Sequence, residues 1–220
     1  MAGFVVMEGS PGLTLDQVAH AVSPGRGRDA SGYGLSTKGL LRATHAAEFI
    51  IKQGIEARGG VAIASGYKTP ADKSGKPWSP PRSSEIFRRG KPEAYSTADA
   101  WRKLGVGAAA IRIEPRSFNS ITNLVNCEYG GRGGSRGYFP DDRPVAIVAQ
   151  EKHLERFIDV IAPKVLRRDY LGIVVPEEDD GLDQDGSLYR LASQATLLGV
   201  RPNAPYIVGR TTIMARGIGA

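Results

Sequence analysis

The sequence predicts an α/β protein with a three-layer, Rossmann-like fold, in which a mainly parallel sheet of about five strands carries helices on both faces. Three observations predict this. Short, continuous apolar runs recur along the chain, as in strands buried on both faces of a parallel sheet. Segments with helical spacing separate most of these runs, which indicates right-handed βαβ units. The chain has 220 residues, enough for one well-buried core, so we expect a single domain over residues 1–220.

Five short apolar runs are the expected strands, at residues 4–7, 61–65, 110–114, 145–149 and 171–175. The first run has no basic residues before it and breaks at Glu8, which is typical of a strand and not of a signal peptide. All apolar stretches are far shorter than the roughly 20 residues that a membrane-spanning helix needs. We therefore expect a cytoplasmic protein with no membrane partner.

Five segments have the spacing of amphipathic helices, at residues 37–53, 93–104, 120–129, 151–161 and 187–198. Ser36 is the expected N-cap of the first helix and Gly54 its stop, since serine accepts from free N–H groups and glycine adopts positive φ. Gly105, Pro163 and Gly199 follow the second, fourth and fifth segments and are expected to end them.

Three irregular stretches, 8–35, 66–92 and 130–144, interrupt this pattern, and residues 15–21 could form a short helix within the first. Loops this long are uncommon unless they cover a site or are mobile. The first two directly follow expected strands, where open α/β sheets bind ligands, so we expect 8–35 and 66–92 to be lid loops. Residues 201–220 form a C-terminal extension, and the sequence leaves open whether it is an added helix or an oligomer contact.

The formal net charge is +6, from 29 basic and 23 acidic side chains. The basic residues are scattered, and their densest groups, Arg26 with Arg28 and Arg88, Arg89 with Lys91, lie in expected loops. No nucleic-acid-binding motif accompanies them. The surplus therefore favours a solvated surface or a small anionic ligand over a nucleic-acid partner.

Thiol and metal chemistry have little support in the sequence. Its single cysteine, Cys127, excludes an intramolecular disulfide and lies in an expected helix, so we expect a buried and inert thiol. His20, His45 and His153 lack the spacing of metal ligands. The acidic run 177–180 lacks the EF-hand pattern and is expected to be a solvated loop. We expect no metal site.

Glycine follows the first two expected strands. Residues 7–12 contain Gly9 and Gly12 without a G-x-G-x-x-G or Walker pattern, so a phosphate loop and a flexible strand exit both stay open. Ser65 and Gly66 end the second strand, where a serine can donate to a ligand and a glycine permits close backbone approach. The G-x-S-x-G pattern of serine hydrolases does not occur here.

Polar residues crowd the end of the third strand and the helix that follows. We expect one of Ser117, Asn119 and Ser120 to cap that helix. The others, together with Glu114 and Asn123, would then lie beside free helix N–H groups and form a site for an anion or a ribose.

His153 and Arg156 follow the fourth strand and share one face of a helix because they are three residues apart. A histidine there can act as an acid, a base or a hydrogen-bond donor, and an arginine can hold a carboxylate or phosphate in a fork. Surface residues have the same spacing, so this pair alone does not establish a site.

Taken together, these segments resemble the YdcF/SanA/ElyC-like family, a widespread bacterial domain of Rossmann-like fold. The family pattern has a strand ending in S-G-G, an E-A pair opening a helix before L-x-x-x-G-V, then E-x-x-S-x-N-T-x-E-N, and finally T-x-x-x-H-x-x-R. The resemblance covers about residues 4–176. It is carried, in order, by Arg42, Ser65-Gly66, Glu93-Ala94, Gly105-Val106, Glu114, Ser117, Asn119, Ser120, Thr122, Asn123, His153 and Arg156.

The chain departs from that pattern at several positions. Tyr67 replaces the second glycine of S-G-G, Thr122 replaces an acidic residue and Ala149 replaces a threonine. The glycine pattern of the first expected strand is altered to Glu8-Gly9-Ser10. These changes favour a different ligand or a specialised member of the family.

The resemblance implies one cluster at the strand ends and a nucleotide-like or S-adenosylmethionine-like ligand. We expect an enzyme that catalyses group transfer, with His153 and Glu114 as its catalytic residues. The pKa of His153 is expected to lie near the pH at which the enzyme works. An alternative is a non-catalytic ligand-binding or regulatory module that uses the same pocket. The expected ligand-binding residues are Arg42, Ser65, Gly66, Glu93, Ser117, Asn119, Ser120, Asn123 and Arg156.

Overall fold

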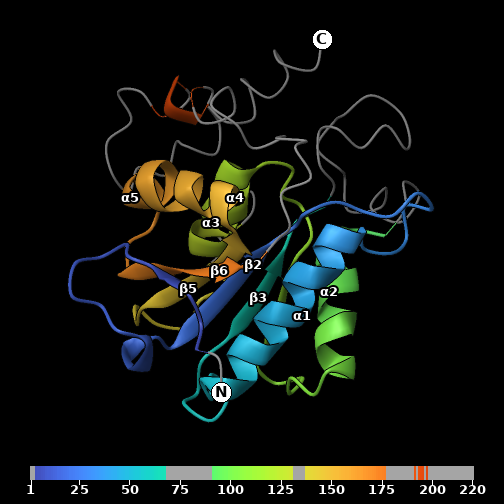
Figure 1. Cartoon of the computed structure of the whole chain (residues 1–220), viewed down its shortest axis with the longest axis horizontal. Coiled ribbons are helices and arrows are strands. Elements are labelled where there is room, and N and C mark those ends of the chain that lie inside the picture. The colour runs from blue at the N-terminus through green and yellow to red at the C-terminus, as the bar shows by residue number, and fades with distance from the viewer. Residues whose placement is uncertain are drawn as a thin grey trace.

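The computed structural model describes residues 3–67, 91–130 and 137–176, together with residues 191, 193–195 and 197. A six-stranded sheet with the order β1-β6-β5-β2-β3-β4 forms its centre (Figure 1). β1 pairs with β6 in the antiparallel sense, and all other neighbours are parallel, which confirms the predicted mainly parallel sheet. The strands are β1 Val6–Met7, β2 His20–Pro24, β3 Ala62–Ser65, β4 Ile111–Glu114, β5 Val145–Gln150 and β6 Tyr170–Val175.

The central strand, β2, was not expected from the sequence. Its residues were assigned to the irregular stretch 8–35, with a short helix over 15–21, but that helix is only a 3₁₀ turn at Leu15–Gln17. β2 is buried along its whole length, although His20, Ser23 and Pro24 interrupt its apolar character. The proline stands two residues beyond Val22, where the pairing of β2 with β5 ends, so its missing N–H interrupts no pair there.

The expected first strand is instead the short edge strand β1. Because β1 runs antiparallel to β6, its carboxyl end lies at the amino end of the parallel strands. Gly9 packs against the start of β6 there, where an added Cβ would lie 2.3 Å from the carbonyl oxygen of Tyr170, and Ser10 N donates to that oxygen at 2.8 Å. Residues 7–12 are therefore not a phosphate loop at the ligand-binding edge of the sheet.

Three predicted helices are confirmed almost residue by residue. Ser36 Oγ accepts from Gly39 N at 3.0 Å and caps the first, while Gly54 follows its end with a φ of 59°. Gly105, with a φ of 97°, follows the second. These helices are α1 Thr37–Lys52, α2 Glu93–Lys103 and α3 Ser120–Tyr129.

The fourth predicted helix is longer than expected. It begins as α4 Glu151–Arg156, widens into a π-helical turn at Phe157–Ile161 and continues as α5 Ala162–Val165. Pro163 directly follows the π-helical turn, in which Ala162 N donates to Phe157 O, and it does not end the helix. The described residues 191, 193–195 and 197 of the fifth predicted helix are helical, and its other residues lie outside the described part.

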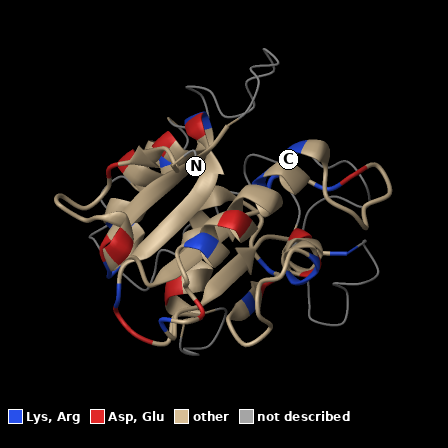
Figure 2. Cartoon of the chain, turned by 60° about the horizontal axis from the view of Figure 1, so that its bottom comes forward, with Lys and Arg blue, Asp and Glu red and all other residues tan. Residues whose placement is uncertain are grey.

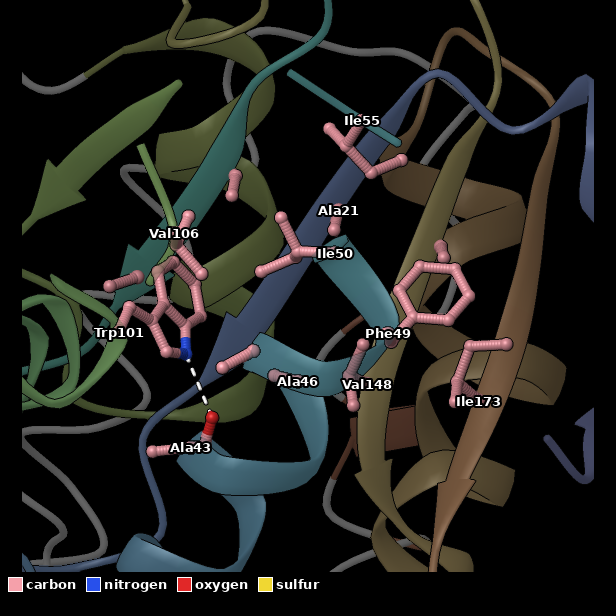
Figure 3. Close-up of a cluster of buried hydrophobic side chains, with 14 of the residues drawn as sticks. Ala21, Ala43, Ala46, Phe49, Ile50, Ile55, Trp101, Val106, Val148 and Ile173 are labelled. Carbon is pink, nitrogen blue, oxygen red and sulfur yellow. Dashed lines mark hydrogen bonds between the residues drawn. The ribbon is translucent and has the colours of Figure 1, made fainter. Parts of the chain in front are cut away.

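Helices cover both faces of the sheet, as predicted (Figure 1). On one face, α1 and α2 pack Phe49, Ile50 and Trp101 against small strand residues, and Trp101 Nε1 donates to Ala43 O at 3.0 Å (Figure 3). On the other face, α3, α4 and α5 pack against the alternate residues of the same strands, such as Val22. None of the described helices has the length and apolarity that a membrane-spanning segment requires.

The strand order places a topological switch point between β2 and β5. From β2 the chain moves outward to β3 and β4, and it then returns to the other side of β2 to form β5 and β6. Connections therefore leave β2 and β5 in opposite directions. In open α/β sheets, ligands bind at such a point, outside the carboxyl ends of the strands.

Candidate functional site

Arg42 occupies the switch point. It comes from α1 and is only 1% exposed. Its Nε donates to Oε1 of Gln150 at the end of β5, at 2.6 Å, and its Nη1 donates to Pro24 O at 2.9 Å and to Gly25 O at 3.2 Å. One guanidinium group thus binds the ends of both strands that diverge here.

His153, Ser120 and Arg156 continue from Arg42 in a single chain of contacts. Nη2 of Arg42 lies 3.0 Å from Nδ1 of His153, and Nε2 of His153 lies 2.8 Å from Oγ of Ser120. Nη2 of Arg156 donates to the same Ser120 oxygen. We call these residues, together with Gln150, the arginine–histidine cluster. It joins α1, the end of β5, the start of α3 and α4.

The charges of three arginines act on His153 in the arginine–histidine cluster. Burial is the main cause that lowers the pKa of His153 well below its ordinary value, and the charges of Arg42, Arg156 and Arg26 lower it further. His153 is consequently neutral at neutral pH. The expectation that the pKa of His153 lies near the working pH is wrong, because the sequence does not show how completely the ring is buried.

Glu114 is the centre of a second polar network, at the ends of β3 and β4. Its Oε2 accepts from Ser65 Oγ at 2.8 Å, and its Oε1 accepts from Arg116 N at 2.9 Å and from Asn126 Nδ2 at 3.2 Å. Burial raises the pKa of Glu114, and hydrogen bonds from Ser117, Ser65, the Arg116 backbone and Asn126 lower it by less. We call this group the Glu114 network.

Ser117 and Asn123 belong to the Glu114 network as well. Asn126 Nδ2 donates to Ser117 Oγ at 2.8 Å, and Ser65 Oγ lies 2.9 Å from Asn123 Oδ1. Asn123 and Asn126 lie one and two turns after Ser120 on α3, so the same helix carries residues of both groups. The Glu114 network binds β3, β4 and α3 together directly beside the arginine–histidine cluster.

Asn119 is the cap of α3. Its Oδ1 accepts from Thr122 N at 2.8 Å, and Asn119 N donates to Thr122 Oγ1 at 3.1 Å, which closes a capping box. Of the three candidates from the sequence, Asn119 therefore caps the helix and leaves Ser117 and Ser120 for other partners. Thr122 performs the capping-box role that an acidic residue at this position can also perform.

Glu93 and Gly66 lie where α2 meets the strand ends. Glu93 is the first residue of α2 and is 1% exposed, and its N donates to Tyr67 O at 3.0 Å. A Cβ added to Gly25 would lie 1.8 Å from Oε2 of Glu93, and one added to Gly66 would lie 3.2 Å from Cα of Gly25. Gly66 thus allows the backbone that leaves β3 to approach the backbone that leaves β2.

Several features were missed in the sequence or lie outside the described residues. Gln150, Gly25 and Arg26 contribute to the switch point, but the strand before Gly25 was not recognised, and Gln150 lacks a charge or a motif.

Among the described residues, no three His, Cys, Asp or Glu side chains are placed to hold a metal. The predicted lid 66–92 is undescribed from 68 to 90, and the acidic run 177–180 and the extension 201–220 also lie outside the described part.

The other sequence features have plain structural positions. Cys127 is buried, and burial raises the pKa of its thiol well above the ordinary value. Tyr67 and Ala149, two departures from the family pattern, are buried as well. Acidic and basic residues are interspersed over the described elements (Figure 2).

A comparison of the chain with models of protein families, with curated proteins and with solved structures finds no match. The resemblance to the YdcF/SanA/ElyC-like family therefore depends on the motifs alone.

Proposed function

We propose that this protein binds a small anionic or nucleotide-like metabolite at the carboxyl ends of β2 and β5 and transfers a group to or from it. One observation carries this proposal. The two buried arginines Arg42 and Arg156 approach each other through His153 and Ser120, which they contact directly. Like charges repel one another strongly where the protein excludes water, and an anion among them would relieve that repulsion.

The start of α3 strengthens the attraction for an anion. Ser120 is the first residue of this ten-residue helix and contacts both His153 and Arg156. The N-terminus of a helix carries a partial positive charge, which favours phosphate or carboxylate groups. The position at the switch point of the sheet is also where ligands bind in folds of this type.

Group transfer is the chemistry that these residues fit best. Both ring nitrogens of His153 and both carboxyl oxygens of Glu114 are engaged in hydrogen bonds, so neither group is placed to exchange a proton with a ligand. Transfer of a phosphoryl group depends mainly on positioning and on stabilisation of negative charge, which fixed arginines supply. We further propose membership of the YdcF/SanA/ElyC-like family, which makes a nucleotide or S-adenosylmethionine the first ligands to test.

A second candidate function is a non-catalytic module that binds the same anion without turnover. The specific observation in its favour is that both ring nitrogens of His153 are engaged by Arg42 and Ser120. A histidine held in this way can position a ligand without acting as an acid or a base.

A thermal-shift screen tests the proposal. The panel contains nucleotides, S-adenosylmethionine, its demethylated product and sugar phosphates. A ligand at 100 times its Kd stabilises the protein by about 2.7 kcal/mol. We expect a shift that Arg156→Gln removes. Arg102→Ala, which removes a charge from the exposed end of α2, should leave the shift unchanged.

Incubation of the protein with the ligand that gives a shift, followed by chromatography of the products, separates the two functions. Conversion of the ligand supports group transfer, and recovery of the unchanged ligand with every acceptor tried supports the binding module. No thermal shift across the whole panel would overturn the proposed ligand class.

A further inference from the structure

We infer that the Ser120 hydroxyl is a dedicated hydrogen-bond donor to the ligand, so that the site selects an oxyanion or another acceptor atom at this point. The inference depends on the proposed function, since it concerns the ligand of the same site. It follows from counting the protons in the contacts among Arg42, His153, Ser120 and Arg156.

Nδ1 of His153 is a hydrogen-bond acceptor. This atom faces Nη2 of Arg42 at 3.0 Å, and a guanidinium group has donors only. Nδ1 must therefore accept and carries no proton. A neutral imidazole has one N–H, which leaves the proton on Nε2. Arg42 thus selects the tautomer of His153 and is a positioning residue.

Ser120 receives two donors as a result. Nε2–H of His153 points at Oγ of Ser120 over 2.8 Å, and Nη2 of Arg156 donates to the same oxygen. A hydroxyl oxygen has two lone pairs and one hydrogen. Both lone pairs are occupied, so the hydrogen has to be directed elsewhere.

No acceptor for that hydrogen is present among the described residues. The hydrogen bonds of Ser120 Oγ in the described part of the chain are the two from His153 and Arg156. The residue is 9% exposed and is the first of α3, at the end of the sheet where ligands are expected to bind. A buried hydroxyl proton without an acceptor is unfavourable, and an oxyanion bound beside Arg156 supplies the acceptor.

In this arrangement Ser120 cannot act as a nucleophile. A serine nucleophile needs a neighbouring base that takes its proton. The nitrogen next to Ser120 already carries a proton, so His153 cannot act as that base. The pair therefore differs from a Ser–His hydrolase pair, although the two side chains are at hydrogen-bonding distance.

The tautomer is measured directly by NMR of protein with ¹⁵N-labelled histidine. Long-range ¹H–¹⁵N correlations distinguish protonated from unprotonated ring nitrogens, and the signals of His153 are assigned by their loss in His153→Gln. We expect an unprotonated Nδ1 and a protonated Nε2 in the free protein at neutral pH. A protonated Nδ1 would overturn the inference, whatever the protein binds.

The donor role is measured by titration with inorganic phosphate. A hydrogen bond to a charged group corresponds to roughly a 10- to 100-fold change in affinity, so Ser120→Ala should raise the Kd for phosphate by that factor. Ser120→Thr keeps the hydroxyl and should bind phosphate nearly as the wild type does. Ser10→Ala, at the opposite edge of the sheet, is the matched control.

The two proposals fail in different ways. If the wild type and Ser120→Ala bind phosphate equally well, the donor role of Ser120 is wrong and the anion site stands. If the wild type does not bind phosphate at all, both the anion site and the donor role are wrong. Rescue by Ser120→Thr together with loss in Ser120→Ala supports both.

Discussion

Arg42 and Gln150 join the two strands that diverge at the switch point. Nε of Arg42 lies 2.6 Å from Oε1 of Gln150, and Nη2 of Arg42 donates to the same oxygen. Nε2 of Gln150 in turn donates to Lys38 O at 3.1 Å, so the side chain fixes the end of β5 to α1. A neutral amide is thus the partner of this buried guanidinium group at the end of β5.

Gln150→Glu should therefore separate stability from ligand binding. A carboxylate forms a charge-assisted bond with Arg42 but cannot donate to Lys38 O, so we expect the stability of the unliganded protein to change by less than about 1 kcal/mol. The same negative charge should weaken phosphate binding roughly tenfold. Urea denaturation and phosphate titration measure the two effects. Gln17→Glu adds an equal charge at the exposed 3₁₀ turn and should leave phosphate binding unchanged; equal losses in both variants would contradict the assignment.

Glu114→Gln should change how stability depends on pH. Burial raises the pKa of Glu114 in the folded protein, so above the ordinary pKa of a carboxyl group the folded state binds more protons than the unfolded state. Stability from this group therefore falls as pH rises from that ordinary value through the raised pKa. A glutamine retains Oε1 as an acceptor for Arg116 N and removes the titration.

We accordingly expect Glu114→Gln to lose less stability than the wild type between about pH 5 and about pH 8, measured by urea denaturation at each pH. Glu151→Gln, at the exposed start of α4, should keep the wild-type dependence. A Glu114→Gln protein that loses stability with pH as steeply as the wild type would show that Glu114 is not the group responsible.

Asn119→Ala should cost about 1 kcal/mol of stability, because Asn119 Oδ1 accepts the N–H of Thr122 at the start of α3. Asn119→Asp or Asn119→Ser retains an acceptor and should recover most of that loss. Since the side chain is occupied as a cap, we expect the Kd for phosphate to change little in all three variants. Loss of phosphate binding in Asn119→Ser, with stability retained, would instead assign Asn119 to the ligand.

Asp141→Ala should destabilise the protein at the amino ends of the parallel strands, opposite the candidate site. Asp141 Oδ1 lies 2.8 Å from Nε2 of the fully buried His20, whose Nδ1 accepts from Val61 N at 3.2 Å. Removal of the carboxylate leaves a buried N–H of His20 without this acceptor and also breaks the hydrogen bonds from Arg143, at a combined cost of roughly 1–3 kcal/mol. Urea denaturation measures this loss.

Asp142→Ala is the matched control for Asp141→Ala, because the adjacent side chain is 96% exposed and its carboxylate lies 3.9 Å from Arg168. We expect a change within about 0.5 kcal/mol. Neither variant should alter phosphate binding, since both lie at the amino end of β5. Equal losses of stability from the two substitutions would show that His20 does not depend on Asp141.

The helices could be predicted from the sequence because their signals are local. Ser36 caps α1 by accepting from Gly39, three residues away, and Gly54 follows the helix with a positive φ. Each signal acts within one turn of the chain. β2 lacked such a signal, since a histidine, a serine and a proline share its five positions and only its neighbours β3 and β5 bury it.

The sequence predicted most residues of the candidate site, but it did not predict what each residue does there. Arg42, Ser120, His153 and Arg156 were all named from the sequence, and the structure brings them into one chain of contacts. The network around Glu114 likewise contains predicted residues. Their division into two groups, with Asn119 as a cap, depends on distances that no spacing in the sequence contains.

The sequence by itself determined the fold class, the boundaries of α1, α2 and α3, and the segments that carry polar residues at the strand ends. Hydrophobic periodicity and caps act over a few residues, so they can be recognised in a linear chain. Only the tertiary structure decided that β2 is central, that β1 lies antiparallel at the edge and that His153 is neutral. Sheet order and the pKa of a buried ring depend on contacts such as that of Arg42 with His153, whose residues are 111 positions apart in the chain.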